Sequence, residues 1–168
     1  MLRRILGLLV FLTAFLPACV GPADNAALAR QAWAKLQAFE METLTSFYAE
    51  DAVIEDLGYG RTGRKIEGRE QILTWLKEVR ENWPGSKFPI LGLVAEGDSV
   101  VVTWRWMGTP KGEAQESGLV PRPVDFRGIT IWEFRNGKIQ RELSVYNYCT
   151  VIEQLRGAEK GGQTEEQQ

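Results

Sequence analysis

Tryptophans at alternate positions are the feature of this sequence that most clearly suggests a site. After Asp98, one alternating set of positions is wholly apolar, and it consists of Val100, Val102, Trp104 and Trp106. Side chains at alternate positions of a strand share one face, so we expect this set to point inward. Tryptophan combines a large apolar ring with an N–H donor and is common in ligand pockets. Trp104 and Trp106 therefore predict either an aromatic ligand pocket or part of an ordinary core.

The composition excludes several kinds of reactive centre. The chain has 168 residues and no histidine, which removes Ser–His and Cys–His catalysis and imidazole metal sites. Its two cysteines, Cys19 and Cys149, are too few for a thiolate zinc site, and we expect neither a metal nor a cofactor. With 20 basic and 22 acidic residues, the chain has no basic excess that would bind a nucleic acid. Carboxylates, tyrosines, lysines, arginines and six tryptophans remain for chemistry.

The N-terminus has the pattern of a targeting segment. Arg3 and Arg4 precede an apolar run over 5–16, which is shorter than the roughly 20 residues that a membrane-spanning helix needs. The run ends in Leu-Pro-Ala-Cys at Cys19, which resembles the bacterial lipobox apart from its proline. We therefore expect a lipoprotein-type signal peptide over 1–18 and a lipid on Cys19 that anchors the protein to a membrane of the bacterial cell envelope. A secreted or periplasmic protein and an uncleaved anchor are the alternatives.

Length and composition predict one domain between two shorter end segments. We expect a linker over 19–25, a folded domain over 26–156 and a disordered tail over 157–168, because the tail holds no large apolar residue. Once Cys19 carries a lipid, Cys149 is a lone thiol and the chain has no internal disulfide. A lone cysteine of this kind is most often a small buried apolar residue, so stability must come from the core.

Hydrophobic periodicity predicts helices first and strands afterwards. Helical spacing is found over 25–48 and 68–83, and a short helix follows at 150–155, where Thr150 and Glu153 fit a capping box. Strand-like segments, with a hairpin turn at 135–138, lie at 52–54, 88–95, 99–108, 123–134 and 139–146. This order predicts an α+β fold with antiparallel strands. The G-x-G-x-x-G at 58–63 does not open a helix directly, so we interpret it as a loop at the mouth of a pocket.

Five short motifs in a fixed order carry a family resemblance. They are FYAEDAV at 47–53, GREQI at 68–72, EGDSVVV at 96–102, NGKI at 136–139 and QL at 154–155. Together they resemble the SnoaL-like polyketide cyclases and the wider NTF2-like superfamily over nearly all of 26–156. The resemblance implies an α+β cone, in which a strongly curved antiparallel or mixed sheet wraps against the N-terminal helices around an apolar pocket. It also implies a homodimer that pairs through the outer face of the sheet.

The resemblance further implies which positions face the pocket, and the cyclase positions depart from the family pattern. The proposed general acid of the cyclases lies seven residues before the Gln-Leu pair, and this position is Asn147 here. An aromatic residue often lies four positions earlier, where this chain has Leu143. Because an amide does not exchange a proton near neutral pH, the usual cyclase chemistry is not expected.

The epoxide-hydrolase branch of the superfamily suggests where a carboxylate could act. That branch has an Arg-x-Asp pair where this chain has Trp104 and Trp106, and a tyrosine and an asparagine where it has Ile54 and Asp56. Loss of solvation beside tryptophans would raise the pKa of Asp56, and a hydrogen bond from Asn147 would oppose the rise. Asp56 could then be a general base, as in ketosteroid isomerases of this fold, or it could merely cap the following loop.

Two functions follow from these residues. The first is non-catalytic binding of a small, mostly apolar or amphipathic molecule in an aromatic pocket. The second is a cofactor-free isomerase, cyclase or lyase with Asp56 as its base and Tyr48, Tyr59 or Tyr146 as donors, and Glu142 as the next base to consider. It gains support if Asp56 and Asn147 enter one cavity within about 6 Å of each other. The predicted ligand-binding residues are Tyr48, Ile54, Asp56, Trp104, Trp106, Leu143 and Asn147.

Overall fold

The described residues, which are 22–60, 62–111 and 121–157, form one mixed sheet of six strands. In the computed structural model the strands are β1 (Tyr48–Asp56), β2 (Arg64–Glu67), β3 (Ile90–Glu96), β4 (Ser99–Gly108), β5 (Val124–Arg135) and β6 (Lys138–Tyr146). Their spatial order is β2-β1-β6-β5-β4-β3, and neighbours are antiparallel except for β1 and β6, which are parallel. The predicted signal peptide, Cys19 and residues 158–168 of the predicted tail lie outside the described residues.

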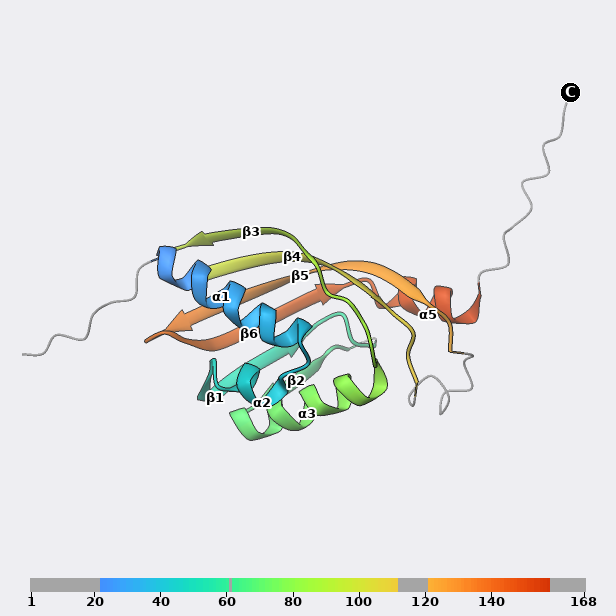
Figure 1. Ribbon diagram of the computed structural model, residues 1–168, viewed down its shortest axis with the longest axis horizontal. Coiled ribbons are helices and arrows are strands. Elements are labelled where there is room, and N and C mark those ends of the chain that lie inside the picture. Colours follow the sequence, from blue (N-terminus) through green and yellow to red (C-terminus); the bar gives the residue numbers. More distant parts are fainter. Residues whose placement is uncertain (1–21, 61, 112–120, 158–168) are drawn as a thin grey trace, which may run out of the picture.

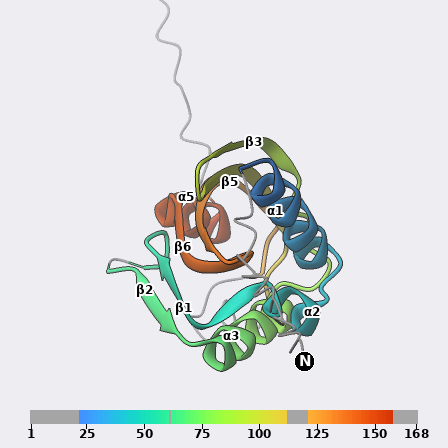
Figure 2. The ribbon, with the colours of Figure 1, turned by 90° about the vertical axis from the view of Figure 1, so that its left-hand side faces the viewer.

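Helices pack across the curved sheet, which confirms the predicted α+β class. They are α1 (Pro22–Gln37), α2 (Met41–Thr45), α3 (Arg69–Asn82) and α5 (Tyr148–Arg156). Figure 2 shows the sheet curling from β3 to β2, with α1, α2 and α3 across its open side. Helix α5 lies beyond the ends of β5 and β6 (Figure 1). No helix in the described part of the chain is long and apolar enough to cross a membrane.

The predicted helix over 25–48 is broken by a turn at Phe39. This residue has a φ of 55°, and the amide of Glu40 donates to the carbonyl of Lys35, which closes the end of α1. Apolar residues continue at helical spacing beyond the break because a second helix follows, and this helix, α2, buries Met41 and Leu44. Tyr48, which we expected to end the helix, instead begins β1.

Strand β2 directly follows the predicted loop at 58–63 and was not among the strands predicted from the sequence. It pairs antiparallel with β1, and Val53 lies opposite Glu67. Gly60 and Gly63 have positive φ values, 62° and 73°, which glycine adopts without strain. Strands β1 and β2 therefore form a hairpin, and β2, not a helix, follows the last glycine of the G-x-G-x-x-G motif.

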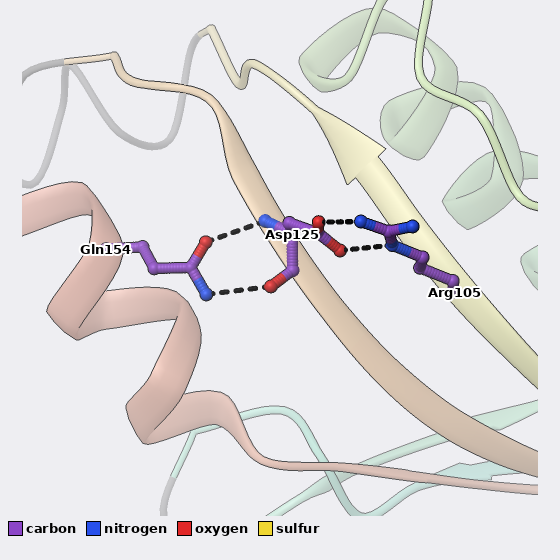
Figure 3. A network of polar contacts seen from close by, with 3 residues as sticks. All are labelled: Arg105, Asp125 and Gln154. Atoms are coloured by element: carbon purple, nitrogen blue, oxygen red, sulfur yellow. Dashed lines mark hydrogen bonds and ion pairs between the residues drawn. The ribbon is translucent and has the colours of Figure 1, made fainter.

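Helix α5 begins after Asn147 and not at the predicted capping box. The Asn147 side chain accepts a hydrogen bond from the Thr150 amide at 3.3 Å, which makes it the N-cap. Gln154 fastens α5 to β5, because its amide accepts from Asp125 N at 2.6 Å and donates to Asp125 O at 2.8 Å (Figure 3). Arg105 of β4 binds the carboxylate of the same aspartate through two nitrogens. These contacts hold α5 at the end of the sheet.

Strand β4 follows the alternation that the sequence predicted. Its inward positions are buried up to Trp104, and its outward positions, such as Thr103, are partly exposed. Elsewhere on the sheet, exposed apolar side chains include Val94, Ile129 and Val145. Cys149 on α5 is exposed, so the expectation of a buried thiol is wrong.

Candidate functional site

A cavity of about 190 Å³ lies between the curved sheet and the helices. Its walls include all six tryptophans and all four tyrosines of the chain. The tryptophans are Trp33, Trp75, Trp83, Trp104, Trp106 and Trp132, and the tyrosines are Tyr48, Tyr59, Tyr146 and Tyr148. Such side chains present an apolar ring and a polar tip, which suits the wall of a small-molecule pocket. This cavity is the candidate site.

Strand β4 brings Trp104 and Trp106 to the cavity, as the alternation predicted. Opposite Trp104, β5 has Gly128, where a Cβ atom would overlap the indole ring. The N–H of Trp104 donates to Thr130 Oγ1 at 2.9 Å. Trp106 meets Phe88 edge-on, with ring centroids 4.2 Å apart, and its buried N–H has no acceptor among the described residues. The N–H of Trp106 is therefore a buried indole donor that is available to a ligand.

Asp56 ends β1 with its side chain at the cavity wall and only 4% of its surface exposed. The Gly58 amide donates to Oδ1 at 3.2 Å, and the Tyr146 hydroxyl donates to Oδ2 at 3.4 Å. Burial raises the pKa of Asp56 to about 6, and the charge of Glu142 is the second cause. One oxygen thus caps the loop, as one interpretation predicted, and the other contacts a tyrosine of the cavity.

A second buried carboxyl, that of Glu142 on β6, also lines the cavity. Tyr48 OH and Trp132 N–H donate to its Oε2, the latter at 2.8 Å, and Ser144 OH donates to its Oε1 at 3.0 Å. Burial raises the pKa of Glu142, while these three donors oppose the rise. From the sequence, Glu142 was only the next base to consider after Asp56 and was not among the predicted ligand-binding residues.

Glu142 ends a chain of hydrogen bonds along the cavity wall. Trp104 donates to Thr130, whose hydroxyl lies 2.8 Å from that of Ser144, and Ser144 donates to Glu142. The pairing of β5 with β6 sets this order, because Thr130 lies opposite Ser144 and Trp132 lies opposite Glu142. A buried polar network with every member paired holds its side chains in one arrangement.

Asn147 is not in the cavity, and the prediction that it faces Asp56 is wrong. It is exposed beyond the end of β6, where it caps α5. Tyr146 makes the contact with Asp56 that we had expected from Asn147. Ile54 was also predicted to line the pocket, but it is completely buried in the core and is not part of the wall. Tyr48 does line the cavity, where its partner is Glu142.

Leu143 is also absent from the cavity wall, because a bulge reverses the alternation of β6. Ile139 is fully buried, but Gln140 is an extra residue between the positions that pair with β5. Beyond this bulge, Glu142 and Ser144 are buried and Leu143 takes a position on the other face. The prediction for Leu143 is therefore wrong, and the same bulge brings Glu142 into the cavity.

Charges are unevenly distributed around the cavity. Arg64 and Lys111 also line it, and the Arg64 guanidinium lies 3.7 Å from the ring centroid of Tyr59. Among the ion pairs of the described residues, none includes Asp56 or Glu142. Within the same residues, no three His, Cys, Asp or Glu side chains gather into a possible metal site. The arrangement can therefore bind a small molecule or move a proton with a carboxyl group.

Comparison with known proteins places the chain in a family. The sequence profile of the SnoaL-like domain matches residues 28–142. A search of curated proteins found no match. Several solved structures share the fold, all with sequence identities below 25%.

One is a protein of ketosteroid isomerase-like fold from Catenulispora acidiphila in complex with trimethylamine, with 23% identity, coverage of 75% of this chain and 90% of that chain, and a TM-score of 0.64. Another is a proposed SnoaL-like polyketide cyclase from Shewanella putrefaciens, with 20% identity, coverage of 78% and 95%, and a TM-score of 0.68. A third is an NTF2-like protein of unknown function from Mesorhizobium loti, with 18% identity, coverage of 75% and 93%, and a TM-score of 0.61. The profile match covers more than half of the chain, and the chain therefore belongs to the SnoaL-like domain family.

Proposed function

We propose that this domain binds a small, mostly apolar molecule in its aromatic cavity and does so without catalysis. The observation that carries the proposal is that every tryptophan and every tyrosine of the chain lines this one space. An apolar cavity of about 150 Å³ holds a molecule of the size of benzene. The cavity of about 190 Å³ therefore suits a ligand near the size of one ring, and it is smaller than the usual pocket for a drug-sized molecule.

The ligand also carries a polar group in this proposal. Trp106 has a buried N–H without an acceptor among the described residues, and an unpaired buried donor is costly. Asp56 has free acceptor capacity, because an ionised carboxylate accepts about four hydrogen bonds and the described residues provide two donors. A compact amphipathic molecule would satisfy both groups. The trimethylamine complex of the Catenulispora protein is consistent with a ligand of this size.

Native mass spectrometry of the gently purified protein tests the proposal, because a bound ligand would appear as added mass. Trp106→Ala should weaken binding of the identified ligand by about 2–4 kcal/mol, since a buried aromatic anchor is lost. Trp106→Phe keeps a ring and removes only the N–H donor, so it should cost less. Phe47→Ala is the control, because Phe47 packs against the core and does not line the cavity.

The enzymatic alternative is favoured by one observation, the buried carboxyl of Asp56. With its pKa raised to about 6, this group would be a stronger base than an ordinary aspartate and still mostly ionised at neutral pH. It could take a proton from an acidic C–H and return it elsewhere, which is an isomerase, cyclase or lyase reaction without a cofactor. Asp56→Asn should then abolish turnover and leave binding within about tenfold. Full activity in that variant would exclude Asp56 and direct attention to Glu142.

We also propose a homodimer and a lipid anchor. The dimer is supported by exposed apolar side chains on the sheet, where Ile129 and Val145 lie directly opposite each other on β5 and β6. The anchor is supported by the Leu-Pro-Ala-Cys segment that ends at Cys19. Lipidation there would hold the domain at a membrane of the cell envelope.

A further inference from the structure

We infer that the ligand of the aromatic cavity is a small organic cation, in which an alkylammonium group lies among the aromatic rings near Asp56. This inference rests on the proposed binding function and names the chemical class of its ligand.

The charged groups of the cavity wall favour a cationic ligand. Asp56 and Glu142 are both buried in its wall, and no cation of the described residues pairs with either of them. Burial of a carboxylate without a compensating charge is unfavourable. The raised pKa values of both groups have burial as their main cause, which agrees with this lack of compensation. A cationic ligand would supply the missing charge.

The two carboxyls differ in what they can still accept. Glu142 already accepts three hydrogen bonds, from Tyr48, Trp132 and Ser144. Within the described part of the chain Asp56 accepts two, at 3.2 and 3.4 Å, so its oxygens are the less satisfied pair there. Asp56 is therefore the carboxylate that a cation would approach, and Glu142 adds negative potential from the neighbouring strand.

The aromatic rings of the cavity wall also favour a cationic ligand. A cation over the face of a tryptophan or tyrosine is attracted by the ring, and cages of such rings are a common way to bind quaternary ammonium groups. The protein uses this interaction with one of its own side chains, because the guanidinium of Arg64 lies over Tyr59 at the cavity. Ten tryptophans and tyrosines around one small space provide several further faces.

The two basic side chains at the cavity do not neutralise its interior. Lys111 is exposed, and its backbone amide is bound to Asn82 O at 2.7 Å. Arg64 is partly exposed and lowers the pKa of Asp56 only as the smallest cause, without an ion pair to it. Among the described residues, the buried part of the wall therefore holds two carboxyl groups and no basic side chain.

A pair of molecules with the same shape separates charge from size. Choline and its carbon analogue 3,3-dimethylbutan-1-ol differ in the nitrogen and its positive charge, and calorimetry can measure the binding of each. We expect choline to bind about tenfold more tightly than the alcohol. Asp56→Asn should remove most of this preference. Asp51→Asn makes the same change at an exposed position of β1 and should retain it.

Each outcome bears on a different claim. Equal affinities in the wild type, or tighter binding of the alcohol, would overturn the cation inference and leave binding of apolar molecules intact. A choline preference that survives in Asp56→Asn would also overturn it, because the carboxylate would then not be its source. If neither molecule binds, the cation inference is wrong, and the binding function falls only if native mass spectrometry also finds no ligand.

A pH profile of the wild type keeps the test valid if Asp56→Asn does not fold. Choline has a permanent charge, so a change in its affinity reports on the protein alone. Its affinity should fall about tenfold from pH 7.5 to pH 5 as Asp56 takes up a proton. The groups that face Asp56 are Glu142 and Tyr146 on β6 and Arg64 on β2, and of these only Glu142 could titrate in the same direction. Constant affinity over this range contradicts the inference.

Discussion

Asp56 and Glu142 face one cavity from neighbouring parallel strands, two positions apart in register. Asp56 pairs with Ser144, and Glu142 pairs with Ile54. The charge of Glu142 is the second cause, after burial, of the raised pKa of Asp56. The sheet thus holds two carboxyls where ionisation of one opposes ionisation of the other, an arrangement that is more common at functional sites than in ordinary cores.

Asp56→Asn should stabilise the free protein at pH 7.5 by about 1–3 kcal/mol. The pKa of Asp56 is about 6 in the fold and near 3.9 in an unfolded chain, so the folded state binds this proton more tightly. Its contribution to stability is therefore present at low pH and is lost as the pH rises from about 4 to 6. Urea unfolding at pH 7.5 and at pH 4 measures the difference, which should disappear at the lower pH.

Asp51→Asn is the matched control for this prediction. A hydrogen bond from Gln140 is the main cause that lowers the pKa of Asp51, so its contribution has the opposite sign and the variant should gain no stability at pH 7.5. Equal gains in both variants, or a loss in Asp56→Asn, would show that burial of the Asp56 charge is not costly.

Gly128→Ala should displace Trp104 and damage the cavity. The new methyl group would overlap the indole ring, whose N–H is bound to Thr130. Crowding of this kind typically costs about 1–3 kcal/mol of stability. Thermal unfolding and ligand titration measure both effects. Gly92→Ala is the control on β3, where the nearest atom is the flexible hydroxyl of Thr103, and its ligand affinity should be unchanged.

Val145→Glu should convert a dimer into monomers. Val145 is 42% exposed and pairs with Ile129, which is 44% exposed, so a charge at this point would disrupt an apolar contact between two sheets. Sedimentation at high micromolar concentration measures the mass of both proteins. A wild-type protein that is monomeric under these conditions contradicts the proposed dimer.

Cys19→Ala should abolish incorporation of radiolabelled palmitate into the protein made in bacterial cells. The expectation rests on the order of three N-terminal segments: the two arginines, the apolar run over 5–16 and the Leu-Pro-Ala-Cys sequence that ends at Cys19. Cys149→Ala is the control, because this exposed thiol is the only other cysteine of the chain. Labelling that persists without Cys19 would exclude the proposed anchor.

The spacing of apolar residues predicted a helix or strand correctly where the pattern was regular. Strand β4 alternates strictly between apolar and mixed positions, so its inward face could be identified with Trp104 and Trp106 on it. The break after α1 could not be predicted, because Phe39 adopts a left-handed conformation that its residue type does not favour. The apolar spacing on both sides of Phe39 fitted a single helix.

The site was predicted only in part. Counting residues along a strand assigns the wrong face after a bulge and fails for a residue beyond the end of the strand. Asp56 is in the wall, as its position suggested. Asn147 lies beyond the strand and caps a helix, and the bulge at Gln140 exchanges the faces of Leu143 and Glu142. A bulge has no strong signal in one sequence, although Arg141 interrupts the alternating apolar set Ile139, Leu143 and Val145 beside the bulge.

The most direct test of ligand binding uses the indole N–H signals in a proton–nitrogen correlation spectrum. All six tryptophans line the cavity, so each such signal reports on this one site. Titration with choline or 3,3-dimethylbutan-1-ol should shift several indole signals in a saturable way, and that of Trp106 most, because its N–H has no acceptor among the described residues. Saturable shifts confined to backbone amides outside the cavity, with all six indole signals unchanged, would contradict the account.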